Sequence, residues 1–240
     1  MTSLEDLTGF VPPEAIEAWP KVAEVCPDDG ILMGGTALTV HLHHRLSRDL
    51  DIFTTERFDA DDLELRLRSV GSFATTTKDE GTLNGVLGAT KVQFLWARDQ
   101  QVLEQPTVVS GLAVGSVSDI FATKPKVIGD RGELRDYFDL MRIEKDTGRV
   151  VEEGLQLLAA RYGHDRSGTS IEATVRGLGY FDDVTDDPYL AEVEGADLRD
   201  RIVAYWTARQ PQIVASLDPR GAVTFFDRVA LQSPEDPIAL

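Results

Sequence analysis

Two short motifs limit the possible folds of this chain more than any other feature. Gly34-Gly35-Thr36 follows a short apolar strand predicted over 30–33, and Asp49-Leu50-Asp51 comes soon after it. The residues between the two motifs predict a helix over 37–46, and the alternation around the second motif predicts a strand over 48–54. Successive side chains on a strand point to opposite faces, so Asp49 and Asp51 share one face while Leu50 faces the core.

Two neighbouring carboxylates repel each other, and a fold that keeps them together needs a compensating charge. Divalent cations such as Mg²⁺ prefer oxygen ligands, and two such ions can hold the attacking oxygen and the leaving group of a displacement at phosphorus. The spacing of Asp49 and Asp51 therefore predicts a magnesium site.

The glycine motif fits the same chemistry. Gly34 and Gly35 have no Cβ, so a phosphate can approach their backbone closely. The helix that follows offers free N–H groups and the positive end of its dipole, and Thr36 adds a hydroxyl donor. We therefore predict phosphate binding at Gly34, Gly35 and Thr36.

The remaining pattern predicts a mixed α/β half over 1–115 and a helical domain over 116–240. The predicted strands cover 73–77, 86–97 and 107–114, and the predicted helices cover 13–26 (interrupted at Pro20), 59–69, 117–129, 133–146, 148–162 and 196–216. Residues 163–190 form a polar, Asp-rich stretch, and 217–240 are predicted to form a turn, a short helical piece and a tail.

Composition restricts the setting and the partners. The single cysteine, Cys26, cannot form an internal disulfide, which favours a reducing, cytoplasmic location. No apolar run approaches the roughly 18–20 residues that cross a bilayer, so no membrane partner is expected. The net charge of −17 argues against nucleic-acid binding through bulk charge and leaves only a local basic rim, for which Arg57, Arg66, Arg68 and Lys78 are candidates.

Two segments of the chain resemble a known family. Gly34-Gly35-Thr36-Ala37-Leu38 with Arg45-Leu46-Ser47-Arg48-Asp49-Leu50-Asp51-Ile52-Phe53 is similar to the first motif of the AbiEii/AbiGii nucleotidyltransferase toxins, which include the MenT-type toxins. The run 122–131 with Arg135-Asp136-Tyr137-Phe138-Asp139-Leu140 resembles their second motif. Together the two segments cover only about fifty residues of the chain.

The resemblance implies a polymerase-β-like nucleotidyltransferase fold, Mg²⁺ dependence and a nucleoside triphosphate as donor. It also implies transfer to the 3′ end of tRNA and restraint by a cognate antitoxin. By the same match, Arg45 and Ser47 lie near the nucleotide phosphates. Lys124, Arg131, Asp136 and Asp139 fall on the positions of the second motif, with active-site roles for Lys124 and Asp136.

The pattern around Asp136 independently supports a role for it. Apolar residues surround it on the predicted helix, and a half-buried carboxylate needs a partner to stay ionised. Lys124 or Arg131 is the expected partner, and the pair would either orient Lys124 toward a triphosphate or only pin two helices together. Pro125 departs from the family pattern and predicts that Lys124 lies at a helix start, which leaves Lys126 as a substitute.

A second departure concerns a third carboxylate. Many polymerase-β-like enzymes carry one on a neighbouring strand, but Gln93 occupies the middle of that strand here. Either two carboxylates suffice or another group takes this role.

Two further functions stay open from the sequence. One is a nucleotidyltransferase that acts on a small molecule or a protein hydroxyl, since an acidic cleft would suit a cationic acceptor. The other is a degenerate fold that only binds a nucleotide or a partner protein.

Overall fold

The computed structural model describes residues 3–130 and 132–217. The strands are β1 (Ile31–Met33), β2 (Leu50–Thr54), β3 (Phe73–Asp79), β4 (Thr82–Leu87), β5 (Thr90–Trp96), β6 (Thr107–Val109) and β7 (Leu112–Val114). The helices are η1 (Glu5–Leu7), α1 (Pro13–Val25), α2 (Gly34–Leu42), α3 (Ala60–Val70), α4 (Val117–Asp130), α5 (Leu134–Thr147), α6 (Val151–Tyr162), α7 (His164–Gly177), α8 (Pro188–Glu194) and α9 (Leu198–Ser216).

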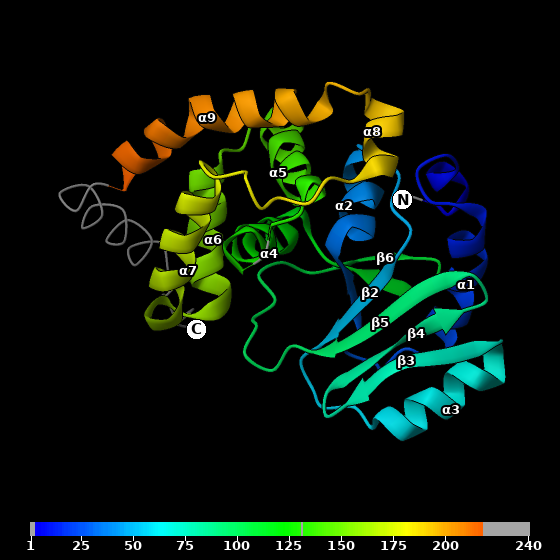
Figure 1. The fold of residues 1–240 in the computed structure, drawn as a ribbon. Helices are drawn as coiled ribbons and strands as arrows, with labels where there is room; N and C mark the ends of the chain where they lie inside the picture. Colours follow the sequence, from blue (N-terminus) through cyan, green and yellow to red (C-terminus); the bar gives the residue numbers. More distant parts are fainter. Residues whose placement is uncertain (1–2, 131, 218–240) are drawn as a thin grey trace, which may run out of the picture.

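The strands form one mixed sheet with the order β3-β4-β5-β2-β1-β7-β6. In the centre, β2 runs parallel to β5 and antiparallel to β1, while β1 runs parallel to β7. Figure 1 shows the sheet with α1 and α3 on one side of the molecule and the later helices on the other. The central strand β2 carries Asp51, so this residue lies between the two strands that pair with β2, namely β1 and β5.

The two faces of the sheet differ in character. Alternate side chains of β2, β4 and β5 are buried, and Leu50, Ile52 and Phe94 are fully buried. Helices α1 and α3 pack on this apolar side. The other side chains of β2, β4 and β5, which alternate with the buried ones, point to the opposite face of the sheet. They leave a polar surface for the functional site.

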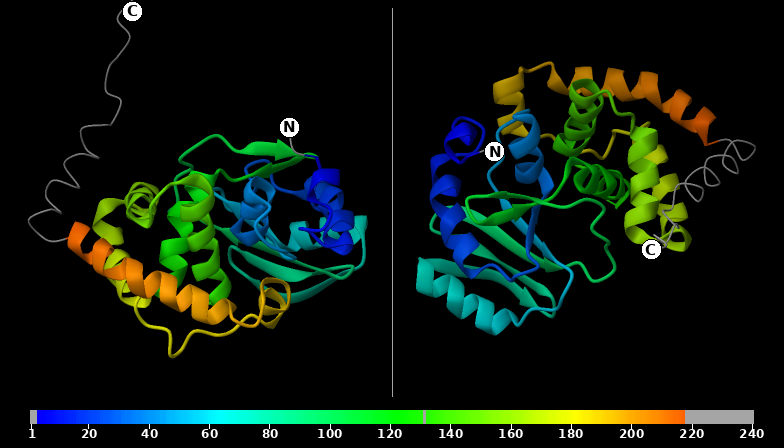
Figure 2. Two further views of the ribbon diagram at one scale, coloured as in Figure 1. Left: turned by 90° about the horizontal axis from the view of Figure 1, so that it is seen from above. Right: turned by 180° about the vertical axis from the view of Figure 1, so that it is seen from behind.

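The helical half is a second layer beside that polar face. Helix α4 packs against α5, α6 and α7, and α9 crosses over α5 to α7, as both views of Figure 2 show. Tyr137, Phe138 and Trp206 are fully buried in this layer. The last strand ends at Val114 and α4 begins at Val117, close to the expected change of character at 115, although the division into two domains stays a prediction.

Two predicted strands are in fact hairpins. The segment 86–97 was predicted as one strand, but β4 ends at Leu87 and β5 starts at Thr90 after a turn at Gly88, which has φ +64°. The segment 107–114 turns likewise at Ser110 and Gly111, with φ values of 45° and +85°. Two successive residues with positive φ match the right-handed twist of paired strands and give a tight hairpin.

Several predicted helix boundaries were also wrong. Helix α1 continues through Pro20, which lies on the exposed side where water can satisfy the freed carbonyl. Helix α4 likewise continues through Pro125, so Lys124 lies inside the helix and not at its start. The polar stretch 163–190 contains α7 and begins α8, and α7 packs on α4 at Gly129. A turn, a short helical piece and a tail were predicted over 217–240, and all of this segment after Leu217 lies outside the described residues.

Among the described helices, none combines the length and the apolar character that a membrane crossing needs.

Candidate active site

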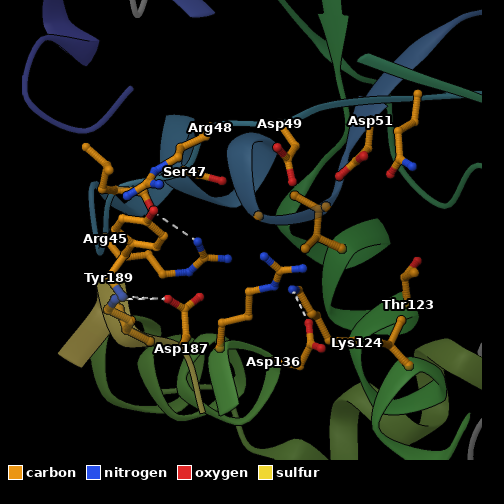
Figure 3. A pocket seen from close by; sticks show the side chains of 18 of the residues that line it. Arg45, Ser47, Arg48, Asp49, Asp51, Thr123, Lys124, Asp136, Asp187 and Tyr189 are labelled. Carbon is orange, nitrogen blue, oxygen red and sulfur yellow. Dashed lines mark hydrogen bonds and ion pairs between the residues drawn. The ribbon is translucent and has the colours of Figure 1, made fainter. Parts of the chain in front are cut away.

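A cavity of about 490 Å³ lies between the polar face of the sheet and the helical half. Its walls come from β2, β4 and β5 on one side and from α4, α5 and α8 on the other. Figure 3 shows Asp49 and Asp51 across the cavity from Lys124 and Asp136. The charged side chains that line it are Arg45, Arg48, Asp49, Asp51, Lys124, Arg135, Asp136 and Asp187.

Asp49 and Asp51 occupy the sheet wall as the sequence predicted. Asp49 immediately precedes β2, Asp51 is the second residue of that strand, and both line the cavity. Leu50 between them is fully buried on the other face. Strand alternation therefore brings the two carboxylates side by side.

The described residues compensate the charge of Asp51 only weakly. Its Oδ1 is buried and has no hydrogen-bond partner among the described residues. Burial, and then the neighbouring charge of Asp49, raise the pKa of Asp51 to about 6. A buried carboxylate oxygen without a partner costs free energy, and a bound cation would offset that cost.

These carboxylates fit a magnesium ion. Mg²⁺ is usually held by one or two carboxylates and completes its coordination with water and substrate phosphates. Asp49 and Asp51 supply that donor set, and Oδ1 of Asp51 is available. No cluster of three or more His, Cys, Asp or Glu side chains that could hold a metal ion occurs in residues 3–130 and 132–217. The fit is therefore to an ion that the substrate helps to coordinate.

The glycines allow the chain to fold tightly around the charged side chains. Gly34 begins α2 with φ +71°, and a Cβ there would lie 2.8 Å from Oδ2 of Asp51. A Cβ on Gly35 would collide with the guanidinium of Arg45 and lie 3.0 Å from the Ser47 hydroxyl. Both glycines line the cavity at the N-terminus of α2, where free N–H groups favour an anion.

Thr36 and Ser47 have different positions relative to the cavity. The buried Thr36 hydroxyl lies 2.6 Å from the Asp49 carbonyl and 2.9 Å from the Ser47 hydroxyl. Thr36 is therefore behind the wall, where it holds the Asp49 backbone in place, and it does not line the cavity. Ser47 does line the cavity.

The helical wall contains a charge cluster in which each ionised side chain has a partner, while the buried Nδ1 of the adjoining His44 has none among the described residues. Nζ of Lys124 lies 2.8 Å from Oδ1 of Asp136 and 2.5 Å from Oδ2 of Asp139. Asp139 also accepts from the Arg45 guanidinium at 2.6 and 2.9 Å and bonds Nε2 of His44 at 2.8 Å. The expected Lys124–Asp136 ion pair is confirmed, and Asp139 is its fully buried centre.

The cluster holds its members in defined charge states. Burial alone would raise the pKa of Asp139, but Arg45 and Lys124 beside it lower that pKa well below its usual range. Burial likewise opposes the charge on Lys124, yet Asp136 and Asp139 raise the pKa of the ammonium. The pKa of His44 is lowered by burial, so His44 is the neutral member.

Arg45 and His44 lie in positions that the expected helix did not predict. Helix α2 ends at Leu42, because His43 adopts a left-handed conformation with φ 49°. The chain then turns toward α5, so His44 is buried against Asp139. Arg45 contacts both the cavity and Asp139, and its approach to phosphates stays a prediction.

The two candidate lysines occupy different positions. Lys124 lines the cavity, whereas Lys126 pairs with Asp130 at 2.5 Å and does not line it. Arg131, the other candidate, lies outside the described residues.

Several cavity residues were not predicted from the sequence. Arg48 lies over the Tyr189 ring at 3.7 Å, and no ion pair joins its guanidinium to a described residue. Arg135 pairs with Glu133 at 2.6 Å. Both arginines lie inside the two motifs that resemble the toxin family. Arg48 directly precedes Asp49 and Arg135 directly precedes Asp136, and these positions could have identified them as cavity residues. Tyr189 is far away in sequence and had no local signal.

The strand chosen for a third carboxylate was correct. Strand β5 pairs with β2 in a register that sets Gln93 beside Asp51. Gln93 lines the cavity, so an amide occupies the place next to the second aspartate.

The four cations of the predicted basic rim lie beside acidic side chains. Each of its four cations is paired with an acid, as Arg57 with Glu80, Arg66 with Asp62, Arg68 with Glu64, and Lys78 with Asp61 and Glu64. Among the cations that line the cavity, Arg48 is the one for which the described residues supply no ion pair.

Comparison with known proteins supports the fold. No protein-family model matches the chain. The uncharacterised protein aq_aa25 of Aquifex aeolicus (strain VF5) is 28% identical over 193 residues, which cover 75% of this chain and 91% of that protein.

Solved structures give a more specific result. A Helicobacter pylori protein proposed to be a nucleotidyltransferase matches with a TM-score of 0.52 and 18% identity, over 86% of this chain and 97% of its own. JHP933 from Helicobacter pylori matches with a TM-score of 0.50 and 16% identity, over 93% and 100% of the two chains. The nucleotidyltransferase toxin MenT4 from Mycobacterium tuberculosis has a TM-score of 0.43, which is too low to support a conclusion. The chain therefore shares the mixed α/β fold of these two Helicobacter pylori proteins.

Proposed function

We propose that this protein is a Mg²⁺-dependent nucleotidyltransferase that moves a nucleoside monophosphate from a nucleoside triphosphate to an acceptor hydroxyl. One observation carries the proposal: Asp49 and Asp51 lie side by side, Asp51 with an uncompensated oxygen, at the N-terminus of α2. This arrangement joins a cation site to an anion site, and a metal-bound triphosphate contains both charges.

The reaction balances as an in-line displacement. The acceptor hydroxyl oxygen forms a bond to the α-phosphorus, the bond from that phosphorus to the bridging oxygen breaks, pyrophosphate leaves, and the hydroxyl proton passes to water. Asp49 and Asp51 would hold Mg²⁺, which neutralises phosphate charge and aligns the reacting oxygens. Lys124, Arg48 and the N–H groups of Gly34 and Gly35 would stabilise the negative charge on the triphosphate.

Lys124 suits this task because its position is fixed before substrate binds. Asp136 and Asp139 hold its ammonium in place and keep it protonated. A preorganised cation costs little reorganisation during the reaction. We assign Asp136 and Asp139 as positioning residues that act through Lys124.

We further propose tRNA as the acceptor and a toxin role with a cognate antitoxin, on the resemblance of the two motifs. The cavity itself removes the argument for a cationic small molecule. Its lining contains Arg45, Arg48, Lys124 and Arg135 against Asp49, Asp51, Asp136 and Asp187, so four basic side chains balance four acidic ones. The net charge of −17 therefore resides elsewhere on the protein.

The test uses purified protein, Mg²⁺, each α-³²P-labelled nucleoside triphosphate in turn, and total tRNA. The variant is Asp49→Ala/Asp51→Ala, and its matched control is Asp182→Ala/Asp183→Ala, which removes the same charge from two exposed positions. We expect label on tRNA with the wild type and the control only. Label on the protein would replace tRNA with a protein hydroxyl, and no pyrophosphate release with any acceptor would contradict the transferase proposal.

The toxin role has a separate test. Controlled expression of the wild type in a bacterial host should arrest growth, while expression of Asp49→Ala/Asp51→Ala should not. Normal growth with the active wild type would remove the toxin role without affecting the transferase proposal.

A further inference from the structure

The register of three strands arranges six side chains of the sheet wall in two rows. Gln93 pairs with Asp51 on one side and with Asn84 on the other, which gives the row Asp51–Gln93–Asn84. Leu95 pairs with Phe53 and with Thr82, which gives the row Phe53–Leu95–Thr82. All six side chains line the cavity.

The first row extends from a carboxylate into two amides. Gln93 and Asn84 are half-buried, and neither side chain has a hydrogen bond or ion pair with any described residue. A side-chain amide carries two donors and an acceptor, so these two can bind both kinds of polar edge. They contribute nothing to the charge of the cavity.

The second row provides an apolar surface next to the amides. Leu95 is 39% exposed although it is a large apolar side chain in the centre of a sheet, and Phe53 is half-buried beside it. A concave site that combines apolar surface with a few polar groups is typical of a ligand pocket.

Charge is divided unequally across the cavity. Its lining cations lie on the loop before β2 and on α4 and α5, and none of the cavity residues on β2, β4 and β5 is a cation. Phosphates belong with those cations and with the N-terminus of α2. The part of the sheet wall beyond Asp51 therefore suits a ligand that is planar and uncharged.

We propose that Gln93 and Asn84 recognise the edge of a nucleobase, which lies on Phe53 and Leu95. This inference rests on the proposed function, since the base would belong either to the donor triphosphate or to the last nucleotide of the acceptor. Both sources share the same chemistry, a flat ring with polar edges. Gln93 would then serve in base recognition in the place next to Asp51.

The test measures binding and does not depend on catalysis. The four ribonucleosides and the four triphosphates with Mg²⁺ are titrated into the wild type, Gln93→Leu and Asn84→Leu by saturation-transfer NMR and calorimetry. Gln101→Leu is the matched control, because Gln101 is exposed and lies outside the cavity. The two test variants should have the same melting temperature as the wild type, because the amides have no partner among the described residues.

We expect the wild type to prefer at least one base and each test variant to bind that base roughly tenfold more weakly. If discrimination among the triphosphates is lost and nucleosides compete with them, the base is that of the donor. The base is that of the acceptor under a different result. In that case the variants bind triphosphates as the wild type does, and the nucleoside that they no longer bind occupies the wild type together with a triphosphate.

Equal binding of all ligands by the wild type and both variants would overturn the inference. A wild type that transfers nucleotides while the variants keep its base preference overturns the inference alone. A wild type that binds bases through Gln93 and Asn84 but never releases pyrophosphate overturns the proposed function alone.

Discussion

The two walls of the cavity handle charge in opposite ways. On the helical wall, Lys124 and Arg45 are matched by Asp136 and Asp139, and every member of the cluster has a partner within the protein. On the sheet wall, Asp49 and Asp51 repel each other, and one oxygen of Asp51 has no partner among the described residues. The helical wall therefore balances its ionic charges without a ligand, whereas the sheet wall does not.

This difference separates stability from function. Removal of one member of a paired buried cluster leaves an uncompensated charge and should destabilise the fold. Removal of an unpaired buried charge should stabilise the fold and abolish the activity that needed it. Substitutions of aspartates on the two walls should therefore have opposite effects on stability, which gives four predictions.

The largest effect should come from the sheet wall. The double variant Asp49→Asn/Asp51→Asn should lower the rate of nucleotide transfer by about ten-thousandfold, on the order of 5 kcal/mol, because the carboxylates that hold the metal are gone. Steady-state pyrophosphate release measures this, with Asp182→Asn/Asp183→Asn as the control. A rate within tenfold of the wild type would contradict the metal role of these carboxylates.

The second effect should come from the helical wall. Asp139→Asn should lower the free energy of unfolding by about 3–5 kcal/mol, because Arg45 and Lys124 would share too little negative charge in a buried site. Urea denaturation measures this. Asp130→Asn is the matched control, since it breaks the exposed pair with Lys126 and should cost about 1 kcal/mol or less. If both variants lowered the free energy of unfolding equally, the buried ion pairs of Asp139 would contribute no more to stability than an exposed pair.

The third effect concerns Asp51 and pH. The pKa of Asp51 in the folded protein, about 6, lies above its ordinary value of 3.8, so the folded state binds this proton more tightly than the unfolded state does. The resulting stability is present below pH 4 and is lost as the pH rises to 6. Asp51→Asn should therefore be more stable than the wild type by on the order of 3 kcal/mol at pH 8, and the difference should vanish near pH 4. Urea denaturation across this pH range measures the difference, and a constant value would contradict the raised pKa of Asp51 as its cause.

The smallest effect should come from added metal. At ten times its dissociation constant, Mg²⁺ should raise the free energy of unfolding of the wild type by about 1.4 kcal/mol. Asp49→Asn/Asp51→Asn should show no such increase, and EDTA should reverse it in the wild type. Equal stabilisation of both proteins would place the ion elsewhere.

Sequence alone predicted the sheet wall better than the rest because its logic is local. The alternation of Asp49, Leu50 and Asp51 follows from strand geometry, and the pairing of Lys124 with Asp136 follows from the cost of a buried carboxylate. The strand that carries Gln93 was also correctly expected next to β2, and the structure adds that Gln93 pairs with Asp51.

The errors had a different physical origin. The turns at Gly88 and at Ser110-Gly111 carried a recognisable signal, but β-rich residues on both sides obscured it. Helix α7 depends on contact with α4, and Tyr189 reaches the cavity from a distant segment, so no neighbouring residues reveal either one. The role of Asp139 as a shared partner likewise appears only when α2, α4 and α5 are assembled.

The Asp139 cluster also determines how the cavity can open. It ties the loop after α2 to both α4 and α5, so these three elements are held together on this side of the cavity. On the opposite side, α8 is a short helix whose Tyr189 is 60% exposed and meets Arg48 only through ring stacking. We therefore expect the side of the cavity at Asp139 to be the more rigid one, and the side at α8 to open at a lower cost in free energy.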